Sequence, residues 1–214
     1  MAKIATTGSA EPTGLPSAPK LTPRGKATRD RIVEAAADLV LAGGIGGTSL
    51  DDIRAGTSTS KSQLFHYFPG GKSQLVRAIA FFQAERVMAA QEPYLSRLAG
   101  WEDWQGWRDA VVRHYGSQPH WGCPIGALFN ELHGTDAERA AEVAAHMERW
   151  RGLLEAGVLR LRDAGEIGAE ADPHALSVAV FASLQGGLLL TASAESIEPL
   201  EDALDGTLAM LRAA

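Results

Sequence analysis

The stretch 48–72 constrains the fold most, because it carries the start and stop signals of two short helices close together. A Ser or Thr side chain accepts a hydrogen bond from a free N–H group at a helix start, and an acidic residue three positions later completes a capping box. Thr48 and Ser49, followed by two acidic residues, fit this pattern and predict a helix over residues 48–55. The Gly-Thr-Ser sequence at 56–58 then favours a turn.

A second helix, over residues 60–68, is predicted after the turn, with Ser60 as its cap. Leu64 and Phe68 lie four positions apart and can share one buried face. The opposite face carries polar or ring-bearing side chains and almost no aliphatic ones: Ser62, Gln63, His66 and Tyr67. A capped helix, a tight turn and a short polar helix together have the form of a DNA-reading helix-turn-helix.

Residues 28–75 resemble the DNA-binding domain of the tetracycline-repressor-like (TetR) family of one-component regulators. The family pattern DIA…GVSKGTLYHYF…K aligns without a gap on Asp52–Phe68, and Lys72 follows after one extra residue. Two positions depart from the pattern, since Ser58 replaces the usual turn glycine and Phe65 the usual tyrosine. The resemblance implies a regulator that binds double-stranded operator DNA, by default as a repressor.

The resemblance places the helix over residues 60–68 in the major groove. Gln can bond adenine and Lys can bond guanine, so the side chains predicted nearest the bases are Lys61, Ser62, Gln63 and His66. By their match to family positions, phosphate contacts are predicted for Thr48, Tyr67 and Lys72. The predicted DNA-binding set is completed by Arg29, Ser49, Ser60 and Phe65.

The formal charge of −6 looks unfavourable for a DNA-binding protein until the chain is divided. Residues 1–80 hold ten Lys or Arg and six Asp or Glu, a balance of +4, so residues 81–214 carry the remaining −10. Charges more than about 10 Å apart are screened at physiological salt. A basic N-terminal part can therefore bind phosphates beside an acidic body.

A chain of 214 residues with 45% hydrophobic content can form one large domain or two small ones. No apolar run approaches the ~20 residues of a membrane span, and the first residues lack a signal-peptide pattern. The single cysteine excludes an internal disulfide and suits a reducing cytoplasm. We therefore expect a cytoplasmic protein with no membrane partner.

Helical periodicity predicts an all-α fold of about nine helices. Residues 1–23 are expected to form a disordered N-terminal arm, residues 24–72 the helix-turn-helix domain, and residues 73–214 an effector-binding and dimerisation domain. Besides the two helices above, helices are predicted over residues 27–42, over a long stretch from residue 71 that could continue past Pro93 only with a kink, and over 101–116, 125–133, 136–164, 173–194 and 199–212.

The five tryptophans all lie between residues 101 and 150. Because ligand pockets are mostly apolar and aromatic with a few polar groups, this cluster predicts a site for a small apolar or aromatic effector, with plain core packing as the alternative. The predicted set is Trp104, Trp107, His114, Tyr115, Trp121, Cys123, Phe129, Asn130, His133, Met147, Trp150 and Phe181. Residues 122–132 are also similar to a GCP-aliphatic-G…L…EL run in a TetR subgroup associated with drug-resistance and efflux genes.

The last two predicted helices contain many small residues, including Ala175, Ala179, Ala182, Gly186 and Gly187, which permit close helix approach. In the TetR family such a pair forms a four-helix interface with its symmetry mate. A symmetric dimer also matches a palindromic operator, so we predict a homodimer through these helices. Internal packing alone is the alternative.

Two other functions fit parts of the sequence. His114, His120, Cys123 and His133 could form a Cys/His nucleophile pair or a metal site of a helical enzyme, but their spacings match no compact zinc pattern. No glycine-rich phosphate loop or Gly-x-Ser-x-Gly elbow is present, so no catalytic residue, metal or cofactor is predicted. The other alternative is a DNA-binding dimer without a small-molecule effector.

Overall fold

The computed structural model describes residues 21–214, and in that range the protein consists of helices without any strand. The helices are α1 (Pro23–Gly47), α2 (Leu50–Thr57), α3 (Lys61–Tyr67), α4 (Gly71–Ala89), α5 (Tyr94–Arg97), α6 (Trp101–Gly116), α7 (Pro124–Leu132), α8 (Ala137–Asp163), α9 (Pro173–Ala194) and α10 (Glu198–Ala213). The all-α prediction is confirmed. The additional element is α5, because the helix that begins at Gly71 ends at Ala89, before Pro93, and a separate single turn follows.

The first helix is longer at both ends than the predicted range 27–42. Thr22 caps it by accepting a hydrogen bond from Gly25 N at 3.1 Å, and Pro23 fills a first-turn position that needs no N–H donor. Pro23 therefore belongs to the helix, and the rest of the predicted arm, residues 1–20, lies outside the described residues. Gly44, with φ of 73°, interrupts the helical geometry where the stop was predicted.

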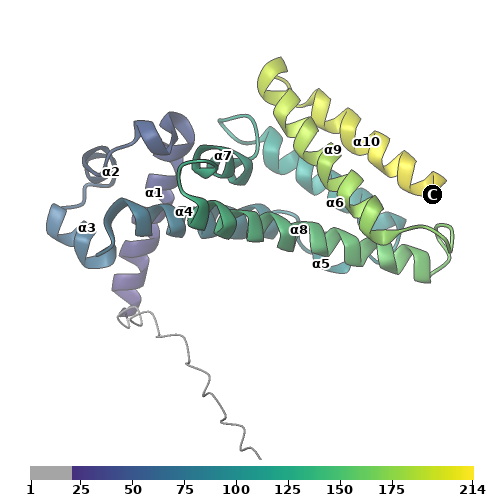
Figure 1. The fold of residues 1–214 in the computed structure, drawn as a ribbon, viewed down its shortest axis with the longest axis horizontal. Helices are drawn as coiled ribbons and strands as arrows, with labels where there is room; N and C mark the ends of the chain where they lie inside the picture. Colours follow the sequence, from purple (N-terminus) through teal and green to yellow (C-terminus); the bar gives the residue numbers. More distant parts are fainter. Residues whose placement is uncertain (1–20) are drawn as a thin grey trace, which may run out of the picture.

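The described part of the molecule is elongated, with α1, α2 and α3 at one end and α9 and α10 towards the other (Figure 1). α1 packs against α2, α4 and α7, while α4 continues away from this end and packs against α8. α9 packs against both α8 and α10, and α10 reaches α6. Helices α4 and α7 therefore connect the helix-turn-helix end to the C-terminal helices.

A buried amide joins the aromatic core. Trp107 Nε1 and Trp150 Nε1 both donate to Gln91 Oε1, at 2.7 and 3.0 Å, and Gln91 Nε2 donates to the Val87 carbonyl at 2.8 Å. The Trp104 ring meets that of Trp107 edge-on, with centroids 5.6 Å apart. All three tryptophans are fully buried, so Gln91 fixes the end of α4 against both α6 and α8.

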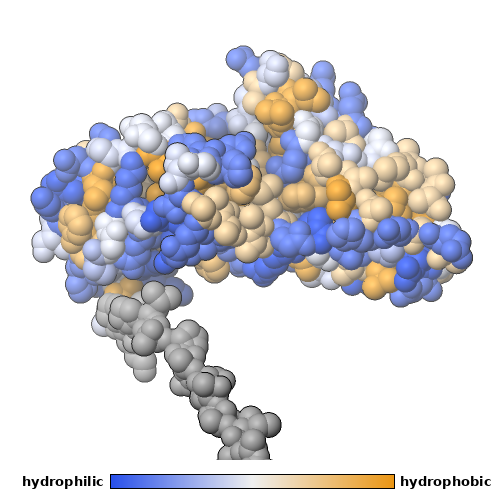
Figure 2. Space-filling model, viewed as in Figure 1, coloured by the Kyte–Doolittle hydropathy of each residue, from blue (hydrophilic) through white to orange (hydrophobic). Residues whose placement is uncertain are grey.

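α9 is apolar on two sides. Its buried side, which includes Val180, Leu184 and Leu188, packs inside the molecule. Its other side, called the α9 stripe below, exposes small or apolar residues at helical spacing: Ala175, Val178, Ala182, Gly186, Leu189 and Ser193. Apolar surface is visible where α9 turns into α10 (Figure 2).

α9 is more apolar than the sequence suggested, since no continuous apolar run was expected to approach the length of a membrane span. By length and composition alone, α9 could cross a membrane. The reason is that apolar residues serve both the core and the exposed stripe, so only 33% of its most apolar window is buried.

We expect Gln91→Leu to lower the free energy of unfolding by about 2 to 4 kcal/mol, because two buried indole N–H groups lose their acceptor. Urea unfolding followed by circular dichroism, at one fixed protein concentration, measures the change. Gln105→Leu, at an exposed position on α6, is the matched control and should stay within about 0.5 kcal/mol. Equal effects of the two substitutions would contradict the role given to Gln91.

Candidate functional site

The capping box of α2 forms, with Ser49 rather than Thr48 as the cap, so the helix predicted over residues 48–55 covers 50–57. Ser49 Oγ accepts from Asp52 N at 3.1 Å, and Asp52 Oδ2 accepts from Ser49 N at 2.8 Å. Hydrogen bonds from Ser49 lower the pKa of the Asp52 carboxyl. Thr48 is buried, and its hydroxyl donates to the Gly44 carbonyl at 2.8 Å, so this predicted phosphate contact faces α1.

The turn between α2 and α3 depends on a left-handed serine. Ser58 has φ of 51° and ψ of 40°, and its N–H donates to the Ala55 carbonyl at 3.3 Å. Arg31 of α1 donates to the Thr57 carbonyl at 2.6 Å and ties the turn to the first helix. The serine that replaces the usual family glycine thus keeps a conformation that glycine adopts at lower steric cost.

α3 has the two faces predicted for it. Leu64 is buried, as is Phe68, which directly follows the helix. The outer face exposes Lys61, Ser62, Gln63, Phe65 and His66, with Tyr67 half-buried at its edge. These outward side chains lie on the helix that the helix-turn-helix geometry would place in a major groove.

Gln63 completes the N-terminal capping box of α3, besides its predicted contact with bases. Ser60 Oγ accepts from Gln63 N, and Gln63 Oε1 accepts from Ser60 N, both at 3.1 Å. A bidentate contact with adenine needs both the amide oxygen and the amide nitrogen. While the cap is intact, Gln63 Oε1 has one lone pair left and its orientation is fixed by Ser60 N, whereas the Nε2 group remains a free donor.

Two cations flank this face. Lys72 lies in the first turn of α4, where no side chain caps the free N–H groups, and this combination suits a phosphate. The Arg29 guanidinium lies over the Phe68 ring, 5.2 Å from its centroid, which holds the arginine beside the end of α3.

The predicted effector residues separate into several places. Trp104, Trp107 and Trp150 belong to the core described above, and Phe181 packs edge-on against Trp150, with centroids 5.3 Å apart. His133 is exposed at the end of α7. These five residues line neither of the two hollows described below.

The other apolar members meet in an open groove of about 380 Å³, called the α7–α9 groove. It is lined by Leu41, Trp121, Gly122, Cys123, Gly126, Ala127, Phe129, Asn130, Met147, Gln185, Leu189 and Ala192. Five predicted residues are therefore brought together from a loop, α7 and α8. Gln185 and Leu189 of α9 were missed, although a glutamine inside an otherwise apolar helix was a usable signal.

His114 and Tyr115 line a different space, called the polar hollow, of about 240 Å³. It is enclosed by α1, α4 and the segment that follows α6, and its other lining residues are Asp38, Leu41, Gln83, Arg86, Gln118, Pro119, His120, Gly122 and Pro124. Burial and the nearby Arg86 charge lower the pKa of the His114 imidazole. This histidine is therefore mainly neutral at pH 7.

Cys123 serves as the N-terminal cap of α7, where its Sγ accepts from Gly126 N at 3.4 Å. Shielding from water raises the pKa of the thiol, whereas a nucleophilic cysteine needs its thiolate form. Within residues 21–214, no group of three or more His, Cys, Asp or Glu side chains could hold a metal ion. The described geometry gives no support to a Cys/His enzyme.

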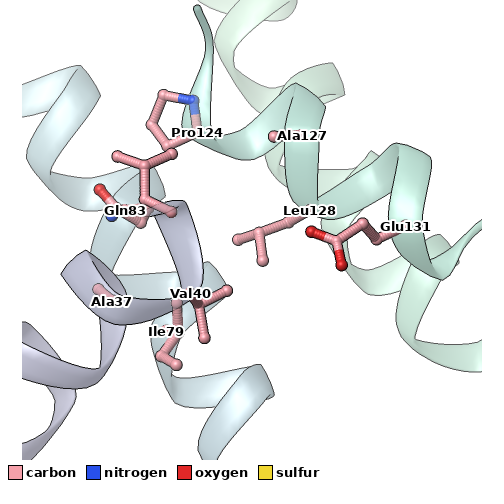
Figure 3. Close-up of a pocket in the computed structure, with 9 residues that line it drawn as sticks. Ala37, Val40, Ile79, Gln83, Pro124, Ala127, Leu128 and Glu131 are labelled. Atoms are coloured by element: carbon pink, nitrogen blue, oxygen red, sulfur yellow. The ribbon is translucent and has the colours of Figure 1, made fainter. Parts of the chain in front are cut away.

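α7 also contacts the helix-turn-helix end directly. Glu131 Oε2 accepts from Ile45 N at 2.6 Å and from Gly46 N at 3.4 Å, in the last turn of α1 after the break at Gly44. Beside it, Leu128 of α7 and Val40 of α1 point into one small hollow that Ile79 and Gln83 of α4 also line (Figure 3). One helix therefore forms a wall of the α7–α9 groove and holds the end of α1, which leads into α2.

Two family models match separate parts of the chain. The one described as bacterial regulatory proteins, tetR family, matches residues 32–79, and the one described as tetracyclin repressor-like, C-terminal domain, matches residues 103–207. The first match contains the capped helices and the turn, and the second contains the whole of the groove-lining helices α7, α8 and α9.

Relatives and solved structures agree with these matches. The uncharacterized HTH-type transcriptional regulator Rv0196 of Mycobacterium tuberculosis is 29% identical, with 81% of this chain and 88% of the relative covered. The HTH-type transcriptional regulator LmrA of Bacillus subtilis is 26% identical, with 81% and 90% covered. A TetR transcriptional regulator from Chloroflexus aurantiacus is similar in structure, with a TM-score of 0.77, 29% identity, and 89% of this chain and 96% of that chain covered.

We expect Ser58→Gly to stabilise the protein by about 0.5 to 1 kcal/mol, since glycine removes the steric cost of the left-handed conformation. Thermal unfolding of both proteins measures the difference. Ser117→Gly is the control, because Ser117 has φ of −94° after α6 and gains nothing from glycine. A destabilised Ser58→Gly protein would show that the serine side chain contributes more than its backbone conformation costs.

Proposed function

Because this chain belongs to the TetR family of DNA-binding transcription regulators, we propose that it is a homodimeric repressor which a small apolar or aromatic molecule releases from a palindromic operator. In this proposal residues 24–72 read DNA in the cytoplasm, and residues 73–214 hold the effector and the dimer contact. The observation that carries the ligand response is the double role of α7, which lines a groove on one side and bonds the start of the helix-turn-helix on the other.

The α9 stripe supports the dimer. Val178 is 44% exposed and Leu189 72% exposed, on a helix that otherwise packs closely. The small residues between them allow a second α9 to approach, and a C2 contact would bury the same stripe from both copies. Leu189 also lines the α7–α9 groove, so the partner would cover one edge of the proposed effector site.

The coupling step follows from the spacing of the two DNA-reading helices. Two recognition helices must stand about 34 to 36 Å apart, or a multiple of that, to meet successive major grooves on one side of the duplex. An effector that moves α7 would shift the Glu131 contact and with it the end of α1, which leads into α2. The effector releases DNA only by binding one arrangement of the two helices more tightly than the other. A hundredfold loss of operator affinity requires a coupling free energy of about 2.7 kcal/mol.

For DNA contact, we expect Lys72→Ala to weaken binding to all operator variants alike, because one phosphate contact is lost. The slope of log affinity against log salt concentration should fall in magnitude by about one unit. Fluorescence anisotropy at several salt concentrations measures both quantities. Arg113→Ala, at an exposed position on α6, is the matched control and should change neither. An effect confined to one operator sequence would contradict a phosphate role for Lys72.

For the dimer, we expect Val178→Glu to produce monomers, because two like charges would face each other across the stripe. Light scattering after size-exclusion chromatography measures the mass, and operator affinity should fall by at least about tenfold as half of the phosphate contacts are lost. Phe81→Glu on α4, also exposed, is the control. A Val178→Glu protein that stays dimeric would place the interface elsewhere.

For the effector, a compound that quenches tryptophan fluorescence in a library screen is the probe, because Trp121 lies partly exposed in the groove. Operator DNA should weaken the affinity of the protein for this compound by the same factor by which the compound weakens the affinity for operator DNA. Phe129→Ala should weaken binding of the compound. Glu131→Ala should leave binding of the compound unchanged but bring the ratio of its affinities without and with operator towards one. Glu170→Ala, which removes an exposed carboxylate elsewhere, is the control for the loss of one negative charge. Equal compound affinity with and without operator would leave the DNA-binding dimer without an effector response.

A further inference from the structure

The polar hollow adjoins the proposed effector groove, with which it shares Leu41 and Gly122, but it has a different chemistry. Its walls come from α1, α4, the end of α6, the segment after it and Pro124, and its volume is about 240 Å³. Leu41, Pro119 and Pro124 make part of the wall apolar. The rest of the lining consists of side chains that can form hydrogen bonds.

One buried polar group of this hollow lacks a partner. Tyr115 is 3% exposed, and its hydroxyl has no hydrogen-bond partner within residues 21–214; the neighbouring Cys123 thiol is a weak acceptor at most. Gln83, also 3% exposed, lines the same hollow. Buried polar groups are almost always paired, so the Tyr115 hydroxyl calls for a partner in the hollow.

The charged groups favour an acceptor-rich occupant. Arg86 Nη2 donates to Gln118 Oε1 at 3.0 Å, and Nη1 is 4.0 Å from Asp38 Oδ1, the outer limit of an ion pair. Most N–H groups of this guanidinium therefore remain available. His114 adds a further N–H donor when neutral, whereas Asp38 is the one carboxylate among the lining residues.

We propose that the polar hollow is a second small-molecule site, which binds an organic carboxylate through Arg86 and the Tyr115 hydroxyl and packs its apolar part against Leu41 and Pro124. Planar guanidinium groups bind carboxylates in a bidentate way, which a lysine or a histidine does not match. Because the walls belong to the DNA-reading end and to the C-terminal part alike, occupancy ties the two together. The site shares Leu41 and Gly122 with the effector groove, but the groups that would bind the carboxylate line the polar hollow alone.

Isothermal titration with benzoate, an aromatic carboxylate, and with the uncharged benzamide tests the proposal on the full chain. Benzoate should bind at millimolar concentration or better, and benzamide at least about tenfold more weakly, because only the anion pairs with Arg86. Arg86→Gln and Tyr115→Phe should each weaken benzoate by about tenfold. Tyr115→Phe keeps the buried ring and removes an unpaired hydroxyl, so thermal unfolding should confirm that this variant is folded.

Two matched variants locate the carboxylate. Arg149→Gln removes an exposed arginine of α8 that pairs with Glu85, and benzoate affinity should not change. Phe129→Ala alters the α7–α9 groove, and benzoate affinity should again stay the same. If Phe129→Ala weakens benzoate while Arg86→Gln does not, the carboxylate sits in the groove and the proposal is overturned. It is equally overturned if benzoate fails to bind at about 10 mM, which leaves water as the occupant of the hollow.

Discussion

The acceptor that Gln91 offers to two indole N–H groups sets the position of α4, on which most of the remaining structure depends. Its side chain holds the C-terminal end of α4 against Trp107 of α6 and Trp150 of α8. The N-terminal end of the same helix carries Lys72 beside the DNA-reading α3. A helix held firmly at one end transmits displacement to the other, because packed interiors deform little. The aromatic cluster thus serves chiefly as an anchor.

α7 provides a second and softer connection between the two ends. Its first turn is capped by Cys123, and Phe129 and Asn130 line the groove. Its last turn carries Glu131, which accepts hydrogen bonds from backbone N–H groups next to Gly44, a point where α1 is already interrupted. A charged acceptor on N–H groups at a break in a helix is a contact that a small movement can lengthen. We infer that α4 fixes the relative position of the two ends of the molecule and that α7 is the helix that moves.

The two hollows differ in a way that follows from their walls. The α7–α9 groove is built from apolar faces of α7, α8 and α9, and it opens beside the exposed α9 stripe. The polar hollow is built where α1 and α4 meet the segment after α6, and there Asp38, Arg86 and His114 come together from distant parts of the sequence. Because the two hollows share Leu41 and Gly122, an apolar compound and an organic carboxylate would occupy adjacent sites, and both would act where the DNA-reading end meets the C-terminal part.

The sequence by itself determined the local elements, because their signals act within a few residues. The capping boxes at Ser49 and Ser60, the turn at Ser58 and the polar face of α3 are all decided over three or four positions, where hydrogen-bond geometry leaves little choice. Only the tertiary structure decided which aromatics are core and which face a groove. Trp121 and Trp150 look alike in sequence, and they differ because other helices, far along the chain, bury one and leave the other partly exposed. The inward turn of Thr48 and the presence of Tyr115 and Arg86 in one hollow could not be predicted, for the same reason: burial is set by elements that the local pattern does not contain.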